Sequence, residues 1–329
     1  MDVKLIYSTP DYHKLVETVM RICYQSYDKE TESSHKSIRA IIAKGHLSIA
    51  SVGNMVFEID VKHSSYYDAL EDLSYMQEIN QFIKWTTPFS HKSSGKFYVS
   101  MNMLTFLDLY KQLDNEATFN ETFTAIFERV QFVDQLRWFY DKKVELPDSP
   151  NVYSAKGCPK LYEPIVLDED YTNLKALGLN DYELGIHSTI TMNFVTDRST
   201  SLQLWRHWSG GCELSQRYVE RGNADFREML GIEDEGLKGI LDEINKQTKD
   251  RYGRLLDLCE KFSIRKGRAK EIARSILPNS ITTQLIQCRP YRNWMHLFKL
   301  RDDKHAQVEC QQDIRAIKKS LREMGVKVD

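Results

Sequence analysis

The sequence predicts an α+β protein, in which helices surround a small number of β-strands. Residues 188–196 (STITMNFVT) alternate between apolar and polar side chains, which is typical of a strand. The last third of the chain instead carries apolar residues at helical spacing. From Cys310 to Met324 these residues recur every three or four positions and predict a final amphipathic helix.

The first elements follow from short local patterns. Residues 3–7 (VKLIY) predict a strand, and the next segment predicts a helix with Thr9 as N-cap and Pro10 at its first position. A second helix contains Ile38 and is expected to stop at Gly45, because glycine commonly ends helices.

Further elements are expected in the middle of the chain. Residues 55–60 (MVFEID) predict a strand, and residues 64–84 carry apolar side chains at helical spacing. Residues 140–182 are rich in Pro, Gly, Asp, Asn and Lys, so we expect mostly loop there. Near the end of the chain, a helix over residues 269–276 should be ended by Pro278.

Composition indicates an ordinary globular protein. The chain has 329 residues, 41% hydrophobic and 28% charged. No apolar run approaches the ~18 residues of a membrane helix, and the N-terminus has no signal-peptide pattern, so we expect a cytoplasmic protein without membrane contact. Its cysteines form no CxxC pair, which favours free thiols and argues against a zinc or other metal site. The six are Cys23, Cys158, Cys212, Cys259, Cys288 and Cys310.

Charge is unevenly distributed, although the net charge is only −2. Residues 251–301 contain 12 Lys or Arg side chains against three acidic ones. A basic stretch in a nearly neutral protein suggests an anionic partner, although many such runs are solvated helix faces. Small phosphorylated ligands and nucleic acid both fit the charge. No nucleic-acid-binding module has its signature here, so nucleic acid is not expected.

The densest group of polar and charged side chains lies between Gln203 and Arg221, after the strand expected at 188–196. Sites are often built where a chain leaves a sheet, although a solvated loop fits this composition too. Gly210 and Gly211 would let the backbone approach a ligand, and arginines match phosphates and uracil-like carbonyls. The chemistry-bearing side chains are Arg206, His207, Glu213, Ser215, Arg217 and Tyr218.

No nucleophile can be argued from this segment. Ser215 has no GxSxG motif around it, and His207 lies eight residues away in a mixed loop and helix region. A lone cysteine such as Cys212 is more often a small packed residue. GGCELSQRY also lacks the GxxxxGK[ST] pattern of a phosphate loop. The residues alone therefore predict an Arg-rich anion-binding site and no particular reaction.

The same segment resembles the signature of the flavin-dependent thymidylate synthases, which is RHR, seven residues and then Ser, usually ending in SxRY. Arg206-His207 and Ser215-Gln216-Arg217-Tyr218 match it, and the preceding DRSTSLQLWRH resembles DRxxSHQxxRH. The signature is not complete: Trp208 replaces its second arginine, the spacing to Ser215 is six residues, and Cys212 stands where Asn or Gln is usual. Other similar segments follow the family's order: Gly45-His46-Leu47-Ser48 with FEI at 57–59, YVSMNMLTF at 98–106, and residues 271–312. Within the early segment, Ser51 and Val52 replace the Glu-His of many members.

This resemblance implies a single domain over residues 1–329, with a family-variable insertion at about 107–187 and a central, mostly antiparallel sheet flanked by helices. The implied reaction is reductive methylation of dUMP to dTMP. FAD is the cofactor, reduced by NADPH, and methylenetetrahydrofolate, a folate, donates the carbon. In this family no enzyme cysteine attacks the uracil ring. Members are homotetramers whose sites are shared between subunits.

The resemblance also assigns residues, by position, to two ligands. Arg301, Ser215 and Arg217 are the implied catalytic residues, with Arg301 near the pyrimidine. The dUMP contacts are Gln203, Arg206, Glu213, Ser215, Gln216, Arg217, Arg274 and Arg301. The FAD contacts are His46, Ser48, Arg206, His207, Trp208, Arg292 and His296. Taken alone, His46 is also compatible with a helix cap, His296 with a packed histidine, and Arg274 and Arg292 with surface charges.

Two alternatives follow from particular residues. Trp208 and the shorter spacing motivate a relative that transfers a one-carbon group to another pyrimidine nucleotide. The basic stretch at 251–301 motivates a non-catalytic nucleotide- or RNA-binding relative. Because tryptophan has one N–H donor where arginine has five, we also expect weaker FAD binding than in members with the full signature.

Overall fold

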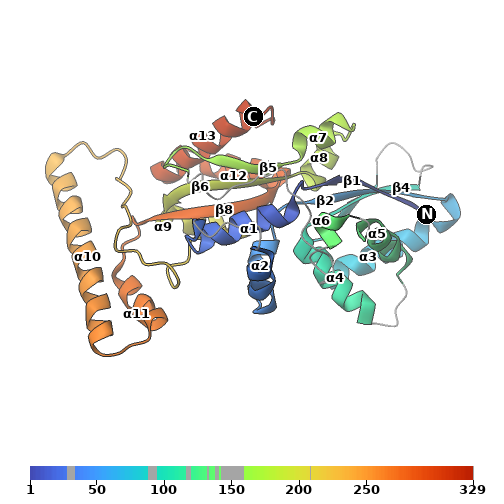
Figure 1. The fold of residues 1–329 in the computed structure, drawn as a ribbon. Coiled ribbons are helices and arrows are strands. Elements are labelled where there is room, and N and C mark those ends of the chain that lie inside the picture. Colours follow the sequence, from blue (N-terminus) through green and yellow to red (C-terminus); the bar gives the residue numbers. More distant parts are fainter. Residues whose placement is uncertain are drawn as a thin grey trace.

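The strands form two four-stranded antiparallel sheets, and helices pack around both (Figure 1). The α+β class and the antiparallel pairing flanked by helices are therefore confirmed, whereas the one central sheet that the resemblance implies is wrong, because the strands divide between two cores. The computed structural model describes residues 1–27, 34–87, 95–115, 120–131, 133–137, 141, 159–207 and 209–328.

The first sheet has the strand order β1-β2-β4-β3 and belongs to the N-terminal half of the chain. Apolar side chains from its helices, such as Leu15, Leu73 and Phe106, bury its inner face. The strands are β1 (Asp2–Ser8), β2 (Met55–Val61), β3 (Lys84–Thr86) and β4 (Gly95–Met101). The helices are α1 (Tyr12–Cys23), α2 (Ser34–Ala43), η2 (Leu47–Ala50), η3 (His63–Ser65), α3 (Tyr66–Ile79), α4 (Met103–Asn115), α5 (Glu121–Val130) and α6 (Asp134–Arg137).

The second sheet has the order β5-β6-β8-β7. Ile190, Met192 and Phe194 of β6 face its core as predicted, but Thr191 and Asn193 are buried as well, so both faces of this strand are covered. The strands are β5 (Ile165–Glu169), β6 (Thr189–Asp197), β7 (Gly210–Glu213) and β8 (Thr282–Pro290). The helices are α7 (Tyr171–Ala176), α8 (Asp181–His187), α9 (Arg198–Trp205), α12 (Tyr291–Arg301) and α13 (Val308–Glu323).

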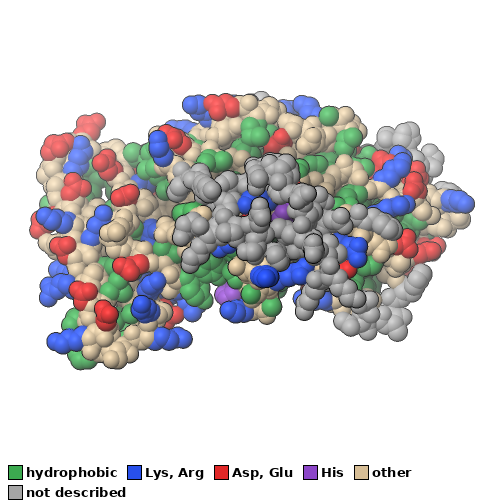
Figure 2. Space-filling model, viewed as in Figure 1, with side chains coloured by type: hydrophobic (Ala, Val, Ile, Leu, Met, Phe, Trp, Pro, Cys, Tyr) green, Lys and Arg blue, Asp and Glu red, His purple; other side chains and the backbone are tan. Residues whose placement is uncertain are grey.

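An arm extends from the second sheet and consists of α10 (Glu235–Lys261) and α11 (Lys266–Ala273), followed by η4 (Arg274–Ile276) (Figure 1). Acidic and basic side chains are intermixed over the visible face of this arm (Figure 2). The basic stretch therefore forms no uniform basic patch on that face. Among the described helices, none is both long and apolar enough to cross a membrane.

Two local expectations are wrong. Helix α1 begins at Tyr12 rather than at Pro10, because the Thr9 hydroxyl does not cap it and instead donates to Asp168 Oδ2 at 2.9 Å. Within the expected loop at 140–182, residues 165–169 form β5 and residues 171–176 form α7. Burial of a few apolar side chains in the second core outweighs the polar composition there.

A buried polar layer joins the two sheets. The Asn54 side chain donates to Asp170 Oδ2 at 2.7 Å and to the His187 carbonyl at 2.6 Å. The imidazole of His187 lies 2.7 Å from Thr86 Oγ1 and 2.9 Å from Ser100 Oγ. Burial, and then the charge of Arg292, lowers the pKa of His187 to about 3. His187 is therefore neutral in the folded protein at any ordinary pH.

This histidine predicts acid sensitivity. Below pH ~6.5 the unfolded chain protonates its histidines, whereas folded His187 stays neutral down to a pKa of about 3. Unfolding then takes up a proton, so the free energy of unfolding falls by about 1.4 kcal/mol per pH unit across this window. Urea unfolding at pH 7.5 and pH 5 should show a loss about 2 kcal/mol larger in the parent than in His187→Gln. Equal losses in both proteins would contradict a neutral buried His187.

Candidate functional site

The turn after α9 carries Arg206 and His207, and a buried arginine holds its backbone. Arg289, on β8, donates to the carbonyls of His207 and Leu204, each at 2.8 Å. Its guanidinium is fully buried and lies 5.3 Å from the ring centre of Trp294. The sequence analysis did not single out Arg289. The available signal was a charged residue near the end of the otherwise uncharged segment that forms β8.

His207 lies within a cluster of basic side chains. Arg301 Nη2, at the end of α12, lies 3.1 Å from His207 Nε2, and the His296 ring centre lies 5.9 Å from that of His207. Arginine can only donate, so His207 Nε2 accepts this hydrogen bond and the neutral imidazole carries its proton on Nδ1. Burial, followed by Arg301, Arg289, His296 and Arg206, lowers the pKa of His207. The cluster thus favours a neutral histidine among cations.

Arg301 has a buried donor that the fold does not use. Its Nε atom is buried and has no hydrogen-bond partner among the described residues. Buried polar groups in proteins are nearly always hydrogen-bonded, so this donor is available to an acceptor from outside the chain. Arg227, in the buried network of α9, also has a buried Nε without a partner among the described residues, so what distinguishes Arg301 is its position beside His207. Together with exposed Arg206 and half-buried His207, this cluster has the chemistry to bind a phosphate or a carbonyl-bearing ring.

The second half of the signature faces another region. Arg217 Nε donates to Glu271 Oε1 of α11 at 3.0 Å, and the Arg217 amide donates to Ser215 Oγ at 3.3 Å. The ring of Tyr218 lies 6.4 Å from that of His46, which is exposed before η2. Residues 215–218 therefore connect the early His46 segment with the arm.

The two glycines serve packing between backbones. A Cβ on Gly210 would lie 2.1 Å from the Ser51 carbonyl oxygen, and one on Gly211 would lie 2.1 Å from the Ile286 carbonyl oxygen. The Gly211 amide donates to Ser51 Oγ at 2.9 Å, and Ser51 Oγ donates to the carbonyl of Ser48 at 2.6 Å. The space beside these two glycines, where a ligand was expected to approach the backbone, is thus occupied by the backbone after η2 and by β8.

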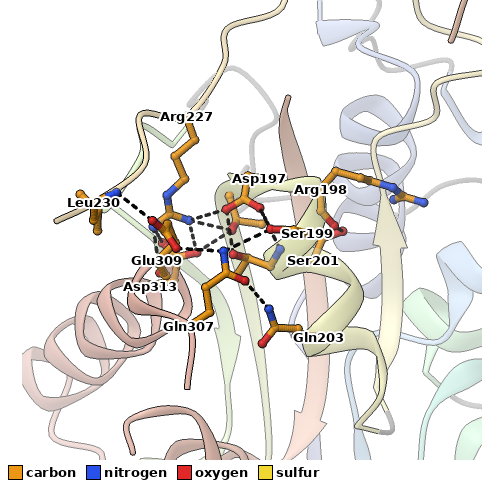
Figure 3. Close-up of polar contacts among 12 residues, drawn as sticks. Asp197, Arg198, Ser199, Ser201, Gln203, Arg227, Leu230, Gln307, Glu309 and Asp313 are labelled. Atoms are coloured by element: carbon orange, nitrogen blue, oxygen red, sulfur yellow. Dashed lines mark hydrogen bonds and ion pairs between the residues drawn. The ribbon is translucent and has the colours of Figure 1, made fainter. Parts of the chain in front are cut away.

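The side chains of Glu213 and Gln203 form hydrogen bonds that hold α9 in place. The Glu213 carboxylate accepts hydrogen bonds from four side chains, those of Arg198, Ser201, Trp205 and Thr283. Gln203 donates to Gln307, and Gln307 donates to Glu309 of α13 (Figure 3). Within one chain, Glu213 and Gln203, both predicted to contact dUMP, therefore stabilise the position of α9.

A buried ionic network anchors the same helix (Figure 3). Arg227 Nη1 lies 3.0 Å from Asp197 Oδ2 and 2.9 Å from Asp313 Oδ2, with all three side chains 1–3% exposed. Asp197 caps α9 by accepting from the Thr200 amide at 2.8 Å. Arg227 also donates to the carbonyl of Glu309 at 2.8 Å. The network therefore ties α9, α13 and the segment before the arm together.

The remaining predicted residues occupy other turns and segments of the chain. Arg292 occupies the first turn of α12, at the opposite end from Arg301. Arg274 is exposed in η4, and Gln216 is half-buried after Ser215. Ser48 is exposed in η2. Trp208 lies outside the described residues.

The thiol nearest to the signature is not activated. Cys212 is buried, and its Sγ lies 3.6 Å from the Val19 carbonyl oxygen, to which it donates. A hydrogen bond with Cys23, followed by burial, raises the pKa of Cys212 well above its usual range. A nucleophilic cysteine needs the opposite shift. Cys212 is therefore a packed residue.

Comparison with known proteins shows a family that part of the chain resembles. Residues 181–324 match the family model Thy1, described as thymidylate synthase complementing protein. The family resemblance is confirmed over these residues. Relatives named flavin-dependent thymidylate synthase include proteins of Mycobacterium tuberculosis (strain ATCC 25618 / H37Rv), 35% identical, and Mycolicibacterium gilvum, 32% identical, each over 112 residues. These alignments cover 32% of this chain and 44% of each relative, so the chain spans less than half of their length. Within 181–324 lie all the predicted site residues except His46 and Ser48.

Proposed function

We propose that the chain catalyses the reductive methylation of dUMP to dTMP, with methylenetetrahydrofolate as the one-carbon donor. The matched relatives are named for thymidylate synthesis with a flavin, and the match contains the His207 cluster. The observation that carries the proposal is the unused buried donor of Arg301, adjacent to neutral His207. This pair can donate to a uracil carbonyl while the surrounding cations stabilise negative charge on the ring.

The residues fit a flavin nucleotide as well. The cationic cluster suits phosphates and ring carbonyls, and we propose that His46, Ser48, Arg206, His207, Trp208, Arg292 and His296 hold FAD. When bound, reduced FAD supplies the hydride, after reduction by NADPH. The protein groups orient the uracil ring and stabilise its charge, with Ser215 and Arg217 directed to the nucleotide. Packed Cys212, whose pKa is raised, is not activated as a nucleophile, which agrees with a reaction that uses no cysteine nucleophile.

A site shared between subunits accounts for the spacing of these residues. His46 lies near Tyr218, whereas Arg292 and Arg301 lie at opposite ends of α12. One copy therefore does not gather the predicted residues around a single point. A homotetramer that combines them from several copies is part of the proposal, as is a cytoplasmic location.

The absorbance spectrum tests this function. We expect the purified protein, after incubation with FAD, to show flavin bands that NADPH bleaches. A protein that stays colourless would reject the flavin enzyme and favour the nucleotide- or RNA-binding alternative. If flavin binds, product analysis with dUMP and with other pyrimidine nucleotides decides between the proposed reaction and one-carbon transfer to another base.

A further inference from the structure

The end of α9 depends on a donor from another element. The helix has no basic side chain in its last turn, and Arg206 and His207 follow it where glycine commonly ends a helix. The last carbonyls of a helix need donors from elsewhere. Arg289 of β8 supplies them, since its Nη1 donates to the carbonyl of His207 and its Nη2 to that of Leu204, each at 2.8 Å. One guanidinium therefore closes the turn that carries His207.

Arg289 is itself held by rigid elements. Its strand, β8, lies between β6 and β7, and its Nη2 also donates to Gln287 Oε1 at 2.8 Å. Its guanidinium lies 5.3 Å from the ring centre of Trp294, whose Nε1 donates to the carbonyl of Ile190 on β6 at 3.0 Å. Arg289 thus has little freedom to move, and the turn at His207 is fixed with it.

The same guanidinium contacts α12, the helix that brings Arg301 to His207. Trp294 and Arg301 are seven residues apart, about two turns, so they lie on the same side of α12. Arg301 Nη2 lies 3.1 Å from His207 Nε2. Arg289 therefore contacts both sides of the His207–Arg301 pair. It holds the turn after α9 through two carbonyls and contacts α12 through Trp294.

Burying this arginine is costly. Arg289 is fully buried, and burial lowers its pKa to about 9, so the guanidinium still carries its charge at neutral pH. A buried cation loses its hydration, whereas a glycine after the helix would end it without a buried charge. What the arginine adds is a fixed geometry and a positive charge next to His207. Burial, then Arg301 and then Arg289 lower the pKa of His207.

We propose that Arg289 is a positioning residue of the proposed reaction. It fixes the turn at His207 against Arg301 and so sets how tightly the cluster binds dUMP, although its own side chain is buried and does not reach a ligand. The kinetic part of this inference rests on the proposed function. The positioning of His207 against Arg301 does not.

The pKa of His207 measures this positioning without turnover. In the parent, Arg301→Met should raise this pKa, because it removes the nearby charge that lowers it most. In an Arg289→Met background the same change should raise it by less than about half as much, because the turn no longer holds His207 beside Arg301. Comparing the effect of Arg301→Met in two backgrounds removes the direct effect of the Arg289 charge. NMR titration of the histidine ring supplies the pKa in the parent, both single variants and the double variant.

Arg227→Met is the matched control background. Arg227 is also a buried arginine that holds α9, but it binds Asp197 at the other end of the helix. There, Arg301→Met should raise the pKa of His207 as much as in the parent. Arg289→Lys keeps a cation but has no planar fork, so it should behave like Arg289→Met, and it tests the proposal if the methionine variant does not fold. Full recovery by lysine would show that only the charge is needed and would overturn the positioning role.

Kinetics test the consequence for the reaction. In a protein that methylates dUMP, Arg289→Met should raise KM and lower kcat/KM by about 10- to 100-fold, the loss expected when a binding group is slightly misplaced. An unchanged kcat/KM overturns the proposal, and so does an Arg301→Met shift of equal size in the parent and in the Arg289 variants. A reduced shift in a protein that never binds FAD would retain the positioning role and reject only the flavin function.

Discussion

Replacing Arg227 with methionine should lower the free energy of unfolding by about 3–5 kcal/mol. The side chain is 1% exposed and lies between two carboxylates, Asp197 and Asp313, at 3.0 and 2.9 Å. Burial already raises the pKa of Asp313 to about 6, although Arg227 opposes this shift. Without the arginine, both carboxylates remain buried without its charge, and one of them must take up a proton. Urea unfolding at pH 7.5 measures the loss.

A second arginine provides the control. Arg315 lies on α13, like Asp313, and pairs with Asp302 at 2.7 Å, but its side chain is 59% exposed. Arg315→Met should cost no more than about 1 kcal/mol, because solvent screens an exposed pair. Adding Asp313→Asn to Arg227→Met should recover part of the loss, since it removes one of the buried charges. A loss in Arg227→Met no larger than in Arg315→Met would show that the buried network does not hold α9.

The elements predicted well from the sequence are those with a regular apolar pattern. Strand β6 and helix α13 each present one periodic face to the second core, so local spacing was sufficient. Strand β8 has no such pattern, because polar Gln284 and Arg289 interrupt it. Both side chains are buried, and their hydrogen-bond partners lie far away in sequence. Gln284, for example, donates to Asn193 Oδ1 at 2.8 Å. A sequence does not show which distant segment satisfies such a side chain.

The same limit applies to the site. The spacing of His207 and Arg301 did not predict their contact, and the resemblance assigned them to different ligands, FAD and dUMP. The buried arginines Arg227 and Arg289 belong to no signature in the sequence analysis. Their partners lie on other elements, so only the fold shows that Arg289 holds the turn after α9 and that Arg227 holds the N-cap of α9. Thr9 failed as a cap for a similar reason, because Asp168, distant in sequence, binds its hydroxyl.

Replacing Arg301 with methionine should reduce kcat/KM for dUMP by about 10²- to 10³-fold, the usual loss when a preorganised donor at a charged transition state is removed. Methionine retains much of the apolar side-chain volume but removes every donor, including the buried Nε that has no partner among the described residues. Lys299→Met, an exposed change on the same helix, is the matched control and should leave kcat/KM nearly unchanged.

The pKa of His207 gives a readout of Arg301 that does not depend on turnover. Arg301 is the nearby charge that contributes most, after burial, to lowering this pKa. In Arg301→Met the pKa of His207 should therefore rise, and the Nε2 atom that accepted from Arg301 at 3.1 Å becomes available for a proton. NMR titration of the histidine ring measures this in the parent, in Arg301→Met and in Lys299→Met. A raised pKa with unchanged kcat/KM would place Arg301 beside His207 but remove it from the reaction, whereas an unchanged pKa would contradict the contact itself.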